Sequence, residues 1–177
     1  MEPSSSTTVD LGPGAPAPGR GAASAESGGR PLEILLVEDN AADVLLTQQI
    51  LRRCRVRTTL TVARDGEEAL AVLGAGGPPP TGPRPDLVLL DLNMPRMGGL
   101  EVLDTVKADP DLAAIPVIVL TSSVDDRDIE QAYRRHANAY VRKPGDLTSL
   151  ADVMAAIGTF WGTVAVLPPH PAPGRRA

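Results

Sequence analysis

Five short apolar runs, each closed by a turn signal and a polar residue, limit what this chain can fold into. They cover residues 33–37, 58–63, 87–90, 117–120 and 139–141. Runs of this length are typical of strands that are buried on both faces, as in a parallel sheet. Parallel neighbours need long crossover connections, so the stretches between the runs are expected to supply helices.

Helical periodicity appears between and after these runs. It covers residues 41–53, 66–73, 98–108, 125–135 and 147–161. Asp65 precedes the second of these helices and Glu68 lies three positions later, which is a capping-box pattern. Five strands alternating with five helices predict an α/β fold of the flavodoxin-like type. We expect a doubly wound, five-stranded parallel sheet with strand order 2-1-3-4-5 and helices on both faces.

The two ends of the chain differ in composition from its middle. Residues 1–30 are mainly Pro, Gly, Ser and Ala, and residues 168–177 are similar. Such segments bury too little apolar surface to offset the entropy lost on ordering. We therefore expect a disordered tail over residues 1–30, one domain over residues 31–167 and a flexible tail over residues 168–177. A loop rich in Gly and Pro interrupts the domain at residues 74–85.

Composition narrows the classes of partner and the compartment. The formal net charge of −5 disfavours a nucleic-acid surface. Cys54 is the single cysteine, so no disulfide forms within the chain and a reducing cytoplasm fits. No apolar stretch approaches the roughly 18–20 residues that span a bilayer. The N-terminus also lacks the basic segment followed by an apolar segment that is typical of a secretory signal. We expect a cytoplasmic protein with no membrane association.

Acidic residues, a threonine and a lysine follow four of the apolar runs. Glu38 and Asp39 follow the first run, Asp91 the third, Thr121 the fourth and Lys143 the fifth. The carboxyl ends of parallel strands share one rim of the sheet, where ligands bind, so these side chains are expected to converge. An acidic cluster favours a divalent cation and a lysine favours an anion. A site that offers both suits a phosphoryl group carried with Mg²⁺.

Each of these residues also has a plainer interpretation. Asp91 alone fits a residue that caps a strand–loop junction, Thr121 fits a strand end, and Lys143 fits a surface lysine. Their occurrence together at successive strand ends favours the site. Mg²⁺ prefers octahedral oxygen ligands, which the carboxylates and the backbone carbonyl of Asn93 could supply.

These motifs resemble the response-regulator receiver domain of two-component signalling. The resemblance covers residues 32–167 and rests on Glu38-Asp39, Asp91 in DLNMPRMGG, Thr121-Ser122 and Lys143-Pro144. VEDNAADVLLTQQIL, KADPDLAAIPVIVLTSS and FWGTVAVLPP further resemble regulators that partner bacterial phytochrome kinases.

The resemblance implies a role for each residue. Asp91 would be the phosphoacceptor that attacks phosphohistidine on a sensor histidine kinase. Glu38, Asp39, Asp91 and the Asn93 carbonyl would bind Mg²⁺, and Thr121 and Lys143 would contact the acyl phosphate. Tyr140 would be an aromatic switch that moves with Thr121.

The same resemblance draws attention to three local features. The Lys143-Pro144 peptide bond is usually cis in this family. His136 stands where receivers commonly have Gly, and Gly145 where larger residues are frequent. His tolerates positive φ better than most residues but less well than Gly, so strain is expected in the turn before the last strand.

Rival functions lack the residues they need. A haloacid-dehalogenase-type phosphatase typically has an acid two positions after its nucleophile, where this chain has Asn93. A nucleotide module needs a glycine loop after the first strand, but the glycine cluster at 74–77 follows a helix. A flavodoxin-type cofactor binder is left open by fold alone. We expect a stand-alone phosphoacceptor that signals through protein contacts and does not turn over a separate substrate.

The last helix predicts self-association. Phe160 and Trp161 are adjacent, and neighbouring residues on a helix point roughly 100° apart, so the two rings cannot easily face the same core. One ring is expected to pack on the VAVLPP arm or on a partner. Together with the resemblance, this predicts a homodimer through the fourth helix, the fifth strand, the fifth helix and the C-terminal arm.

Overall fold

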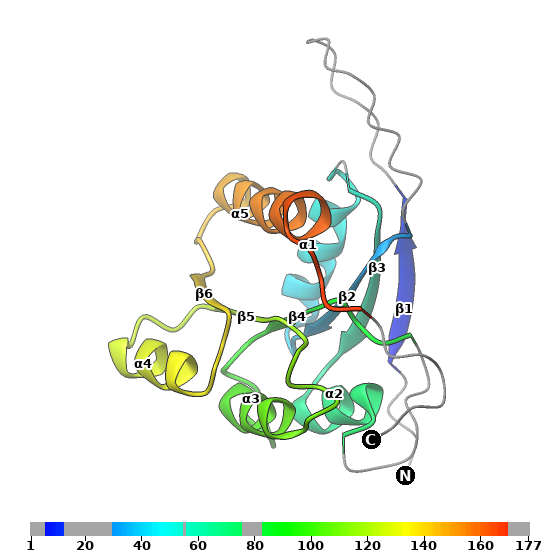
Figure 1. Cartoon of the computed structure of the whole chain (residues 1–177). Helices are drawn as coiled ribbons and strands as arrows, with labels where there is room; N and C mark the ends of the chain where they lie inside the picture. The colour runs from blue at the N-terminus through cyan, green and yellow to red at the C-terminus, as the bar shows by residue number, and fades with distance from the viewer. Residues whose placement is uncertain (1–5, 13–29, 55, 76–82, 170–177) are drawn as a thin grey trace.

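The structure is a computed structural model that describes residues 6–12, 30–54, 56–75 and 83–169. Its strands are β1 (Thr7–Leu11), β2 (Leu32–Val37), β3 (Thr58–Ala63), β4 (Leu87–Leu90), β5 (Val117–Thr121) and β6 (Ala139–Arg142). Its helices are α1 (Ala41–Leu51), α2 (Gly66–Leu73), α3 (Gly99–Ala108), α4 (Asp126–Arg134) and α5 (Leu147–Thr159), and α5 continues into a π-helical turn, η1 (Phe160–Val164). Figure 1 shows these elements in one α/β unit.

The sheet of the described residues has the order β1-β3-β2-β4-β5-β6. Strands β2 to β6 pair in parallel, and they correspond to the five predicted strands. The predicted order 2-1-3-4-5 and the doubly wound α/β class are therefore confirmed. Each predicted boundary lies within about two residues of the observed one, which is the usual uncertainty of element ends.

Strand β1 was not expected, because residues 1–30 were predicted to be disordered. It pairs antiparallel with β3, from Thr7 opposite Val62 to Leu11 opposite Thr58. The side chain of Leu11 is fully buried in the core. The average composition of the N-terminal segment conceals this five-residue run of β-forming residues, so the expectation was wrong for 7–11 and the sheet has six strands instead of five. Residues 1–5 and 13–29 lie outside the described residues.

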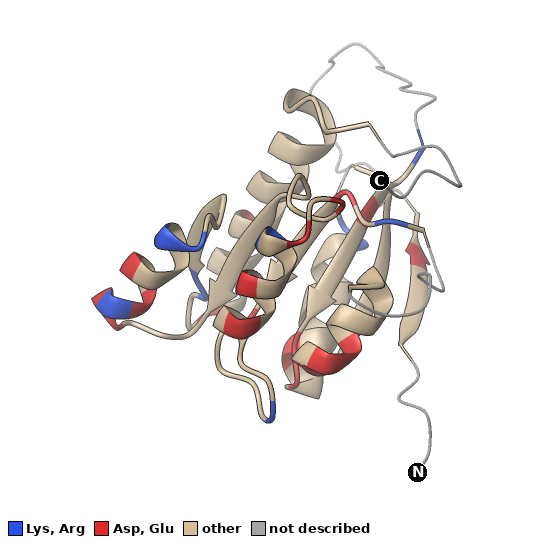
Figure 2. Ribbon diagram, turned by 60° about the horizontal axis from the view of Figure 1, so that its bottom comes forward, with Lys and Arg blue, Asp and Glu red and all other residues tan. Residues whose placement is uncertain are grey.

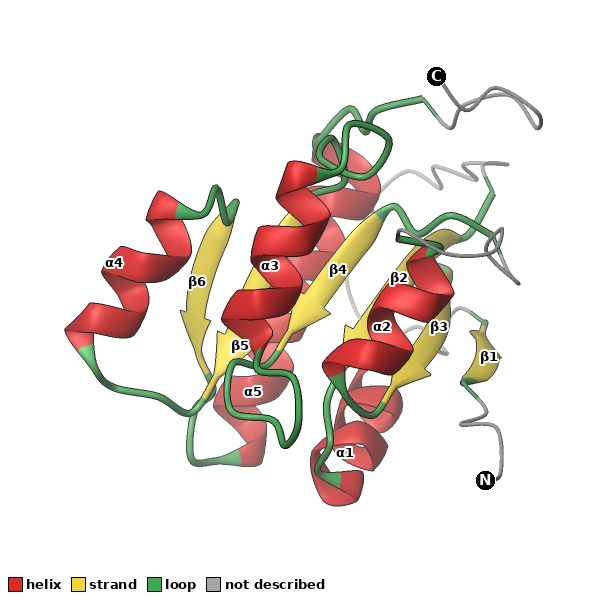
Figure 3. Ribbon diagram, turned by 90° about the horizontal axis from the view of Figure 1, so that it is seen from below, coloured by secondary structure: helices red, strands yellow, loops and turns green. Residues whose placement is uncertain are grey.

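Helices cover both faces of the sheet, as Figure 3 shows. Helices α2, α3 and α4 lie on one face, and α1 and α5 lie on the other. Because side chains alternate along a strand, β2 sends Leu35 and Val37 into the core beneath the first set of helices. It sends Ile34 and Leu36 into the core beneath the second set. Both faces of β2 are thereby buried, as the continuous apolar run predicted.

Charge lies outside the centre of this sheet. Strands β4 and β5 contain no charged residue, and Figure 2 shows the acidic and basic residues mainly on helices and loops. Most of the buried carboxylates among the described residues flank strands: Glu38 and Asp91 follow β2 and β4, and Asp86 precedes β4.

Polar side chains fix where several helices begin. Asn40, Asp65, Asp125 and Asp146 each accept a backbone N–H in the first turn of α1, α2, α4 and α5. The capping box predicted at α2 is present with one difference. Asp65 accepts from the Glu68 N–H at 2.9 Å, but the Glu68 carboxylate accepts at 2.7 Å from the N–H of Arg64, the residue before the N-cap. These caps satisfy N–H groups that have no partner within the helix.

The turn before β6 has the strain that the sequence suggested. His136 adopts φ 63°, a left-handed conformation that a non-glycine residue seldom takes. The described part of the chain contains no cis peptide bond, so the Lys143–Pro144 bond is trans. The expectation of a cis bond, which came from the resemblance alone, was wrong for this structure.

The C-terminal helix buries one stripe and exposes another. Leu150, Met154 and Ile157 of α5 are buried in the core shared with α1. By length and composition alone, 147–164 is also long and apolar enough to cross a membrane, a test that core helices of soluble proteins pass as well. The expectation that no apolar stretch reaches this length was therefore wrong, although the helix lies here on the face of the sheet.

The aromatic pair at the end of α5 is divided as predicted. Trp161 packs against the core, whereas Phe160 is about half exposed. Their rings meet edge to face, with centroids 5.2 Å apart and an interplanar angle of 89°. The helix therefore presents one of its two rings to solvent.

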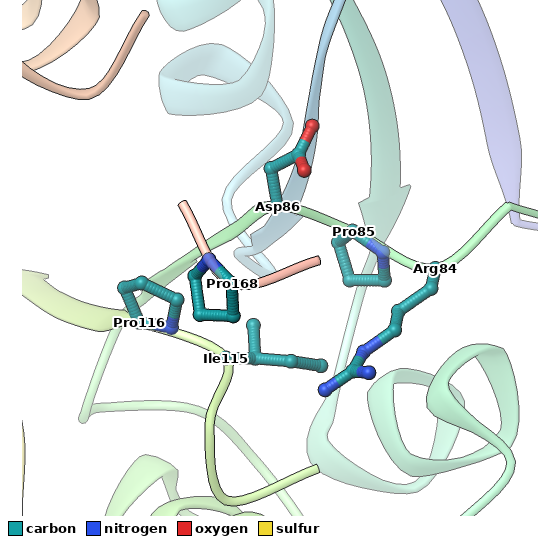
Figure 4. A pocket seen from close by; sticks show the side chains of 6 residues that line it. All are labelled: Arg84, Pro85, Asp86, Ile115, Pro116 and Pro168. Carbon is teal, nitrogen blue, oxygen red and sulfur yellow. The ribbon is translucent and has the colours of Figure 1, made fainter. Parts of the chain in front are cut away.

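The C-terminal arm returns to the end of the sheet where β4 and β5 begin. Leu167 packs against the core, and Pro168 lines a small pocket with Ile115 and Pro116 (Figure 4). The pocket measures about 10 Å³, which is room for one water molecule at most. Pro168 and Pro169 are nevertheless exposed, and residues 170–177 lie outside the described residues, so the flexible tail over residues 168–177 stays a prediction.

Candidate functional site

The register of β2 and β4 places two acidic residues side by side at the rim. Val37 pairs with Leu90, so Glu38 and Asp91 follow at the same level of the sheet. The Asp91 N–H continues the ladder by donating to the Val37 carbonyl at 3.0 Å. Both side chains are buried, with relative exposures of 2% for Glu38 and 6% for Asp91. The predicted convergence of these two carboxylates is confirmed.

The register of β5 and β6 adds the hydroxyl and the lysine. Thr121 ends β5 opposite Arg142, and the Lys143 N–H donates to the Thr121 carbonyl at 2.8 Å. Thr121 is fully buried. Four strands therefore contribute to one rim, although their site residues are separated by up to 105 positions in the sequence.

The ammonium group of Lys143 lies at the centre of the site. Its Nζ donates to Glu38 Oε2 at 2.5 Å, to Asp91 Oδ2 at 2.6 Å and to Asp43 Oδ2 at 3.0 Å. The side chains of Lys143, Glu38 and Asp91 are 12%, 3% and 7% exposed, whereas Asp43 is 37% exposed. Charged groups this deeply buried are stable only when they are paired, and the lysine provides that pairing.

Burial and pairing act in opposite directions on the site's protonation. Burial acts to lower the pKa of Lys143, but its hydrogen bonds to Asp91, Glu38 and Asp43 outweigh burial and raise that pKa. Burial raises the pKa of Glu38, and the hydrogen bond from Lys143 only partly offsets this effect. Lys143 is therefore a permanent cation near neutral pH, and the buried Glu38 carboxylate gains from any further positive charge.

The loop after β4 carries the other polar groups around Asp91. Asp91 Oδ1 accepts from the Asn93 N–H at 3.1 Å, and Asn93 Nδ2 lies 3.5 Å from Thr121 Oγ1. Thr121 Oγ1 also accepts from the Ser123 N–H at 3.3 Å. The backbone of Asn93 thus lies next to the Asp91 carboxylate.

A close approach below Asp91 explains one glycine of the GG pair. A Cβ atom on Gly99 would lie 2.2 Å from the Asp91 carbonyl oxygen and 2.8 Å from Leu92 Cα. Backbone atoms cannot yield to such a contact. Gly99 is therefore required for α3 to begin directly beneath the acceptor, which fixes the loop between β4 and α3.

Tyr140 reaches toward the loop that follows Thr121. It is half-buried on β6, and its hydroxyl donates to the Ser123 carbonyl at 3.4 Å. Its own N–H donates to the hydroxyl of Tyr133 on α4 at 3.3 Å. Burial raises the pKa of Tyr140, so its hydroxyl stays protonated and able to donate. Tyr140 thus connects β6 with α4 through its backbone N–H and with the loop after Thr121 through its hydroxyl.

The structure tests how well these residues suit a divalent cation. Among the described residues, no three acidic, His or Cys side chains are placed to ligate a metal directly. Asp39 is exposed, and Lys143 lies between Glu38 and Asp91. The donor set nevertheless fits by its chemistry, because the carboxylates of Glu38, Asp91 and Asp43 all lie within 3.0 Å of Lys143 Nζ, and carboxylate oxygens are the ligands that Mg²⁺ prefers. Small rotations of the acidic side chains would be needed.

Asp43 belongs to the site but was missed by the sequence reasoning. It lies in the first turn of α1, four residues after Asp39, and contacts Lys143. An acidic residue in a first helical turn is ordinary, because it interacts favourably with the helix dipole. The missed signal was geometric: α1 begins at the rim, so its first turn also faces the cluster.

A buried carboxylate, a lysine and a hydroxyl at the carboxyl ends of a doubly wound sheet define an α/β domain whose rim suits an anion such as a phosphoryl group. The family model of the response regulator receiver domain matches residues 34–155. The chain therefore belongs to the response regulator receiver domain family and is a response regulator of two-component signalling.

Comparison with individual proteins agrees with this assignment. The chain is 42% identical over 138 residues to the response regulator Rcp1 of Synechocystis sp. (strain ATCC 27184 / PCC 6803 / Kazusa), covering 78% of this chain and 94% of Rcp1. The crystal structure of the phosphorylated cyanobacterial phytochrome response regulator RcpA matches 79% of this chain and 100% of its own, at 42% identity and a TM-score of 0.74. The Mn²⁺-bound form of Rcp1 matches 78% of this chain and 100% of its own, at 42% identity and a TM-score of 0.73.

Proposed function

We propose that Asp91 accepts a phosphoryl group from a phosphohistidine of a sensor histidine kinase, with Mg²⁺ as the accompanying cation. The observation that carries this proposal is the position of Lys143 Nζ, 2.6 Å from Asp91 Oδ2 at the end of a central buried strand. After transfer to Asp91, the lysine that now pairs with this carboxylate can pair with the phosphoryl oxygens instead.

The chain's residues divide the work of the transfer. A carboxylate oxygen of Asp91 forms a bond to phosphorus while the bond from phosphorus to the histidine nitrogen breaks, and the imidazole leaves with that electron pair. Lys143 neutralises charge on the phosphoryl oxygens, and the Thr121 hydroxyl donates to one of them. Such reactions depend mainly on positioning and charge neutralisation. Glu38, Asp39, Asp91 and the Asn93 carbonyl would hold Mg²⁺, which neutralises charge on the transferred group.

The metal requirement is tested by labelling with a small phosphodonor. Incubation with acetyl phosphate should label the wild-type protein in Mg²⁺ and not in excess chelator. Asp39→Asn should need a higher Mg²⁺ concentration because it removes a charge from the set. Asp152→Asn, which removes the same charge from an exposed position on α5, should behave as wild type. Unchanged labelling in chelator would show that the metal proposal is wrong.

Tyr140 and Thr121 provide a path by which this change could reach the surface. When Thr121 follows the phosphoryl group, the Ser123 loop moves with it, because Thr121 Oγ1 accepts from the Ser123 N–H. Tyr140 contacts the same loop through its hydroxyl. We therefore infer that phosphorylation shifts Tyr140 and, through it, the surface formed by α4 and β6.

A bacterial phytochrome is the kind of sensor kinase that the relatives suggest. RcpA is a cyanobacterial phytochrome response regulator, and the match covers its full length. Phosphotransfer profiling against the sensor kinases of the source organism tests this partner. Faster transfer from a phytochrome kinase than from the others supports it, and preferential transfer from a kinase without a phytochrome sensor contradicts it.

We also propose a homodimer through α4, β6, α5 and the C-terminal arm. Large apolar side chains are exposed along this surface: Tyr133, Leu147, Phe160, Val164 and Val166. Val166 is 99% exposed. Burying such side chains in a second copy would remove apolar area from water, which favours association.

The dimer is tested by substitutions that leave the monomer core intact. Val166→Asp should shift the protein toward monomer in light scattering, because a charge would then be buried at the interface. Leu45→Asp on α1, also exposed, should leave the dimer intact. These variants are better suited than truncation after Thr159, because Trp161 and Leu167 pack on the core. A wild-type monomer at high concentration, with and without a phosphoryl mimic, contradicts the dimer alone.

A further inference from the structure

Lys143 uses all its hydrogen-bonding capacity in this structure. An ammonium group has three N–H donors, and here they go to Glu38, Asp91 and Asp43. A phosphoryl group on Asp91 would therefore reach a lysine whose charge is already shared among three carboxylates. Any carboxylate that stays on Lys143 competes with the phosphoryl oxygens for that charge.

The three partners differ in how easily they can give up the lysine. Glu38 and Asp91 are almost fully buried, so losing their cation would leave a buried charge without compensation. Asp43 is 37% exposed and begins a helix at the rim, so water can solvate it. Its longer contact, at 3.0 Å, agrees with a weaker hold on the ammonium group.

The position of Asp43 also determines how its charge affects cations and anions at the site. It contacts Lys143 from the first turn of α1 and is the most exposed of the three carboxylates that hold the ammonium group. Its negative charge attracts Lys143 and any cation at the rim, and it repels an incoming phosphoryl group. Interactions between unit charges a few ångströms apart in a partly buried site are large enough to alter affinities severalfold.

We propose that Asp43 is a positioning residue that attenuates the phosphoryl site: it holds the Lys143 ammonium and competes with the phosphoryl group for its charge. This inference rests on the proposed phosphoacceptor function of Asp91. Through Asp43, helix α1 would influence the affinity of the site for a phosphoryl group. It also predicts opposite effects on the two kinds of ligand, since a negative charge favours cations and disfavours anions.

The test uses the full chain and measures two dissociation constants. The first is for Mn²⁺, followed by electron paramagnetic resonance. The second is for trifluoroberyllate, a tetrahedral mimic of the phosphoryl group, followed by ¹⁹F nuclear magnetic resonance at saturating Mg²⁺. Wild type is compared with Asp43→Asn, with Asp91→Asn and with Asp152→Asn, the matched charge control on α5.

Asp43→Asn should bind trifluoroberyllate at least about threefold more tightly than wild type and Mn²⁺ at least about twofold more weakly. Asp152→Asn should match wild type for both ligands. A merely structural role for Asp43 would weaken both ligands or neither, and either result overturns the inference. If wild type binds the mimic no better than Asp91→Asn does, the phosphoacceptor proposal itself fails. If wild type binds the mimic more tightly than Asp91→Asn does, but Asp43→Asn binds both ligands as wild type does, the proposed role of Asp43 is wrong and the phosphoacceptor proposal stands.

Discussion

Two residues other than glycine adopt positive φ in the described part of the chain, Arg96 at 65° and His136 at 63°. Arg96 lies in the loop after Asp91 and ion-pairs with Asp65, the N-cap of α2. That pair joins the acceptor loop to a neighbouring helix and holds Arg96 in its unusual conformation. His136 is exposed and pairs through its N–H with the Tyr133 carbonyl, as a turn requires.

Replacing His136 with glycine should stabilise the protein. A left-handed conformation costs an L-residue roughly 1–2 kcal/mol, and glycine avoids this cost but gains entropy in the unfolded chain. We expect His136→Gly to increase the free energy of unfolding by about 0.5 kcal/mol, measured by chemical denaturation. Ala155→Gly, in the exposed face of α5, should instead decrease it by about 1 kcal/mol. A loss of stability in His136→Gly would show that the imidazole makes a favourable contact.

The ion pair between Arg96 and Asp65 should give stability a dependence on acidic pH. Burial acts to raise the pKa of Asp65, but hydrogen bonds from the Glu68 N–H and from Arg96 outweigh burial and lower it. The stabilisation is therefore complete above the unfolded-state pKa of about 3.9 and is lost as the pH falls through the lower folded-state pKa.

Asp65→Asn isolates that contribution, because Asn also caps helices well. At pH 7 the variant should be less stable than wild type by about 1 kcal/mol, and the difference should shrink as the pH falls below about 4. Thermal denaturation at a series of pH values measures it. Glu130→Gln, which removes an exposed i,i+4 pair with Arg134, should change stability by less than about 0.5 kcal/mol at any pH. A difference for Asp65→Asn that does not vary with pH contradicts the role of the charge.

Among the elements, β1 shows where sequence reasoning failed and why. The five parallel strands were predictable because each is an apolar run that must be buried on both faces. Strand β1 is an edge strand of only five residues in a Pro- and Gly-rich segment, and it depends on pairing with β3, a partner about fifty residues away. Such non-local pairing leaves little local signal.

The contribution of β1 rests mainly on Leu11. Removing most of a buried leucine side chain costs its transfer free energy and leaves a cavity. Leu11→Ala should therefore lower the free energy of unfolding by about 2–3 kcal/mol, measured by urea denaturation. Thr8→Ala, whose side chain is exposed and contacts the Thr61 hydroxyl, should lower it by no more than about 1 kcal/mol. An effect of Leu11→Ala as small as that of Thr8→Ala would show that β1 contributes little to the fold.

Helix faces were less predictable than strand ends. Leu45 on α1 and Tyr133 on α4 are large apolar residues, yet they are 58% and 52% exposed. In α1 apolar residues lie around much of the helix surface, so tertiary packing decides which side turns inward. In α4, which is mostly polar, Ala132 is buried and the adjacent Tyr133 is exposed. The strand-end residues Glu38, Asp91 and Lys143 were predictable because parallel topology fixes the rim on which they lie.

For the whole molecule, fold and site follow from one arrangement: β4 and β5 carry no charged residue, and Glu38, Asp91 and Lys143 meet at the rim where the parallel strands end. At the opposite rim, Pro168 of the C-terminal arm lines a small pocket with Ile115 and Pro116. Asp43 escaped prediction because its contact depends on where α1 begins relative to β6, which local sequence does not encode. The assignment to receiver domains accounts for the full set of residues that converge around Asp91.

The central claim is that Asp91 is the phosphoacceptor. The most direct measurement is the intact mass of the protein after incubation with acetyl phosphate and Mg²⁺, followed by treatment with hydroxylamine, which cleaves acyl phosphates. Wild type and Asp104→Asn, an exposed substitution on α3, should each gain one phosphoryl group that hydroxylamine removes. Asp91→Asn should gain none. Labelling of Asp91→Asn to the wild-type extent would contradict the account and place the phosphoryl group on another residue.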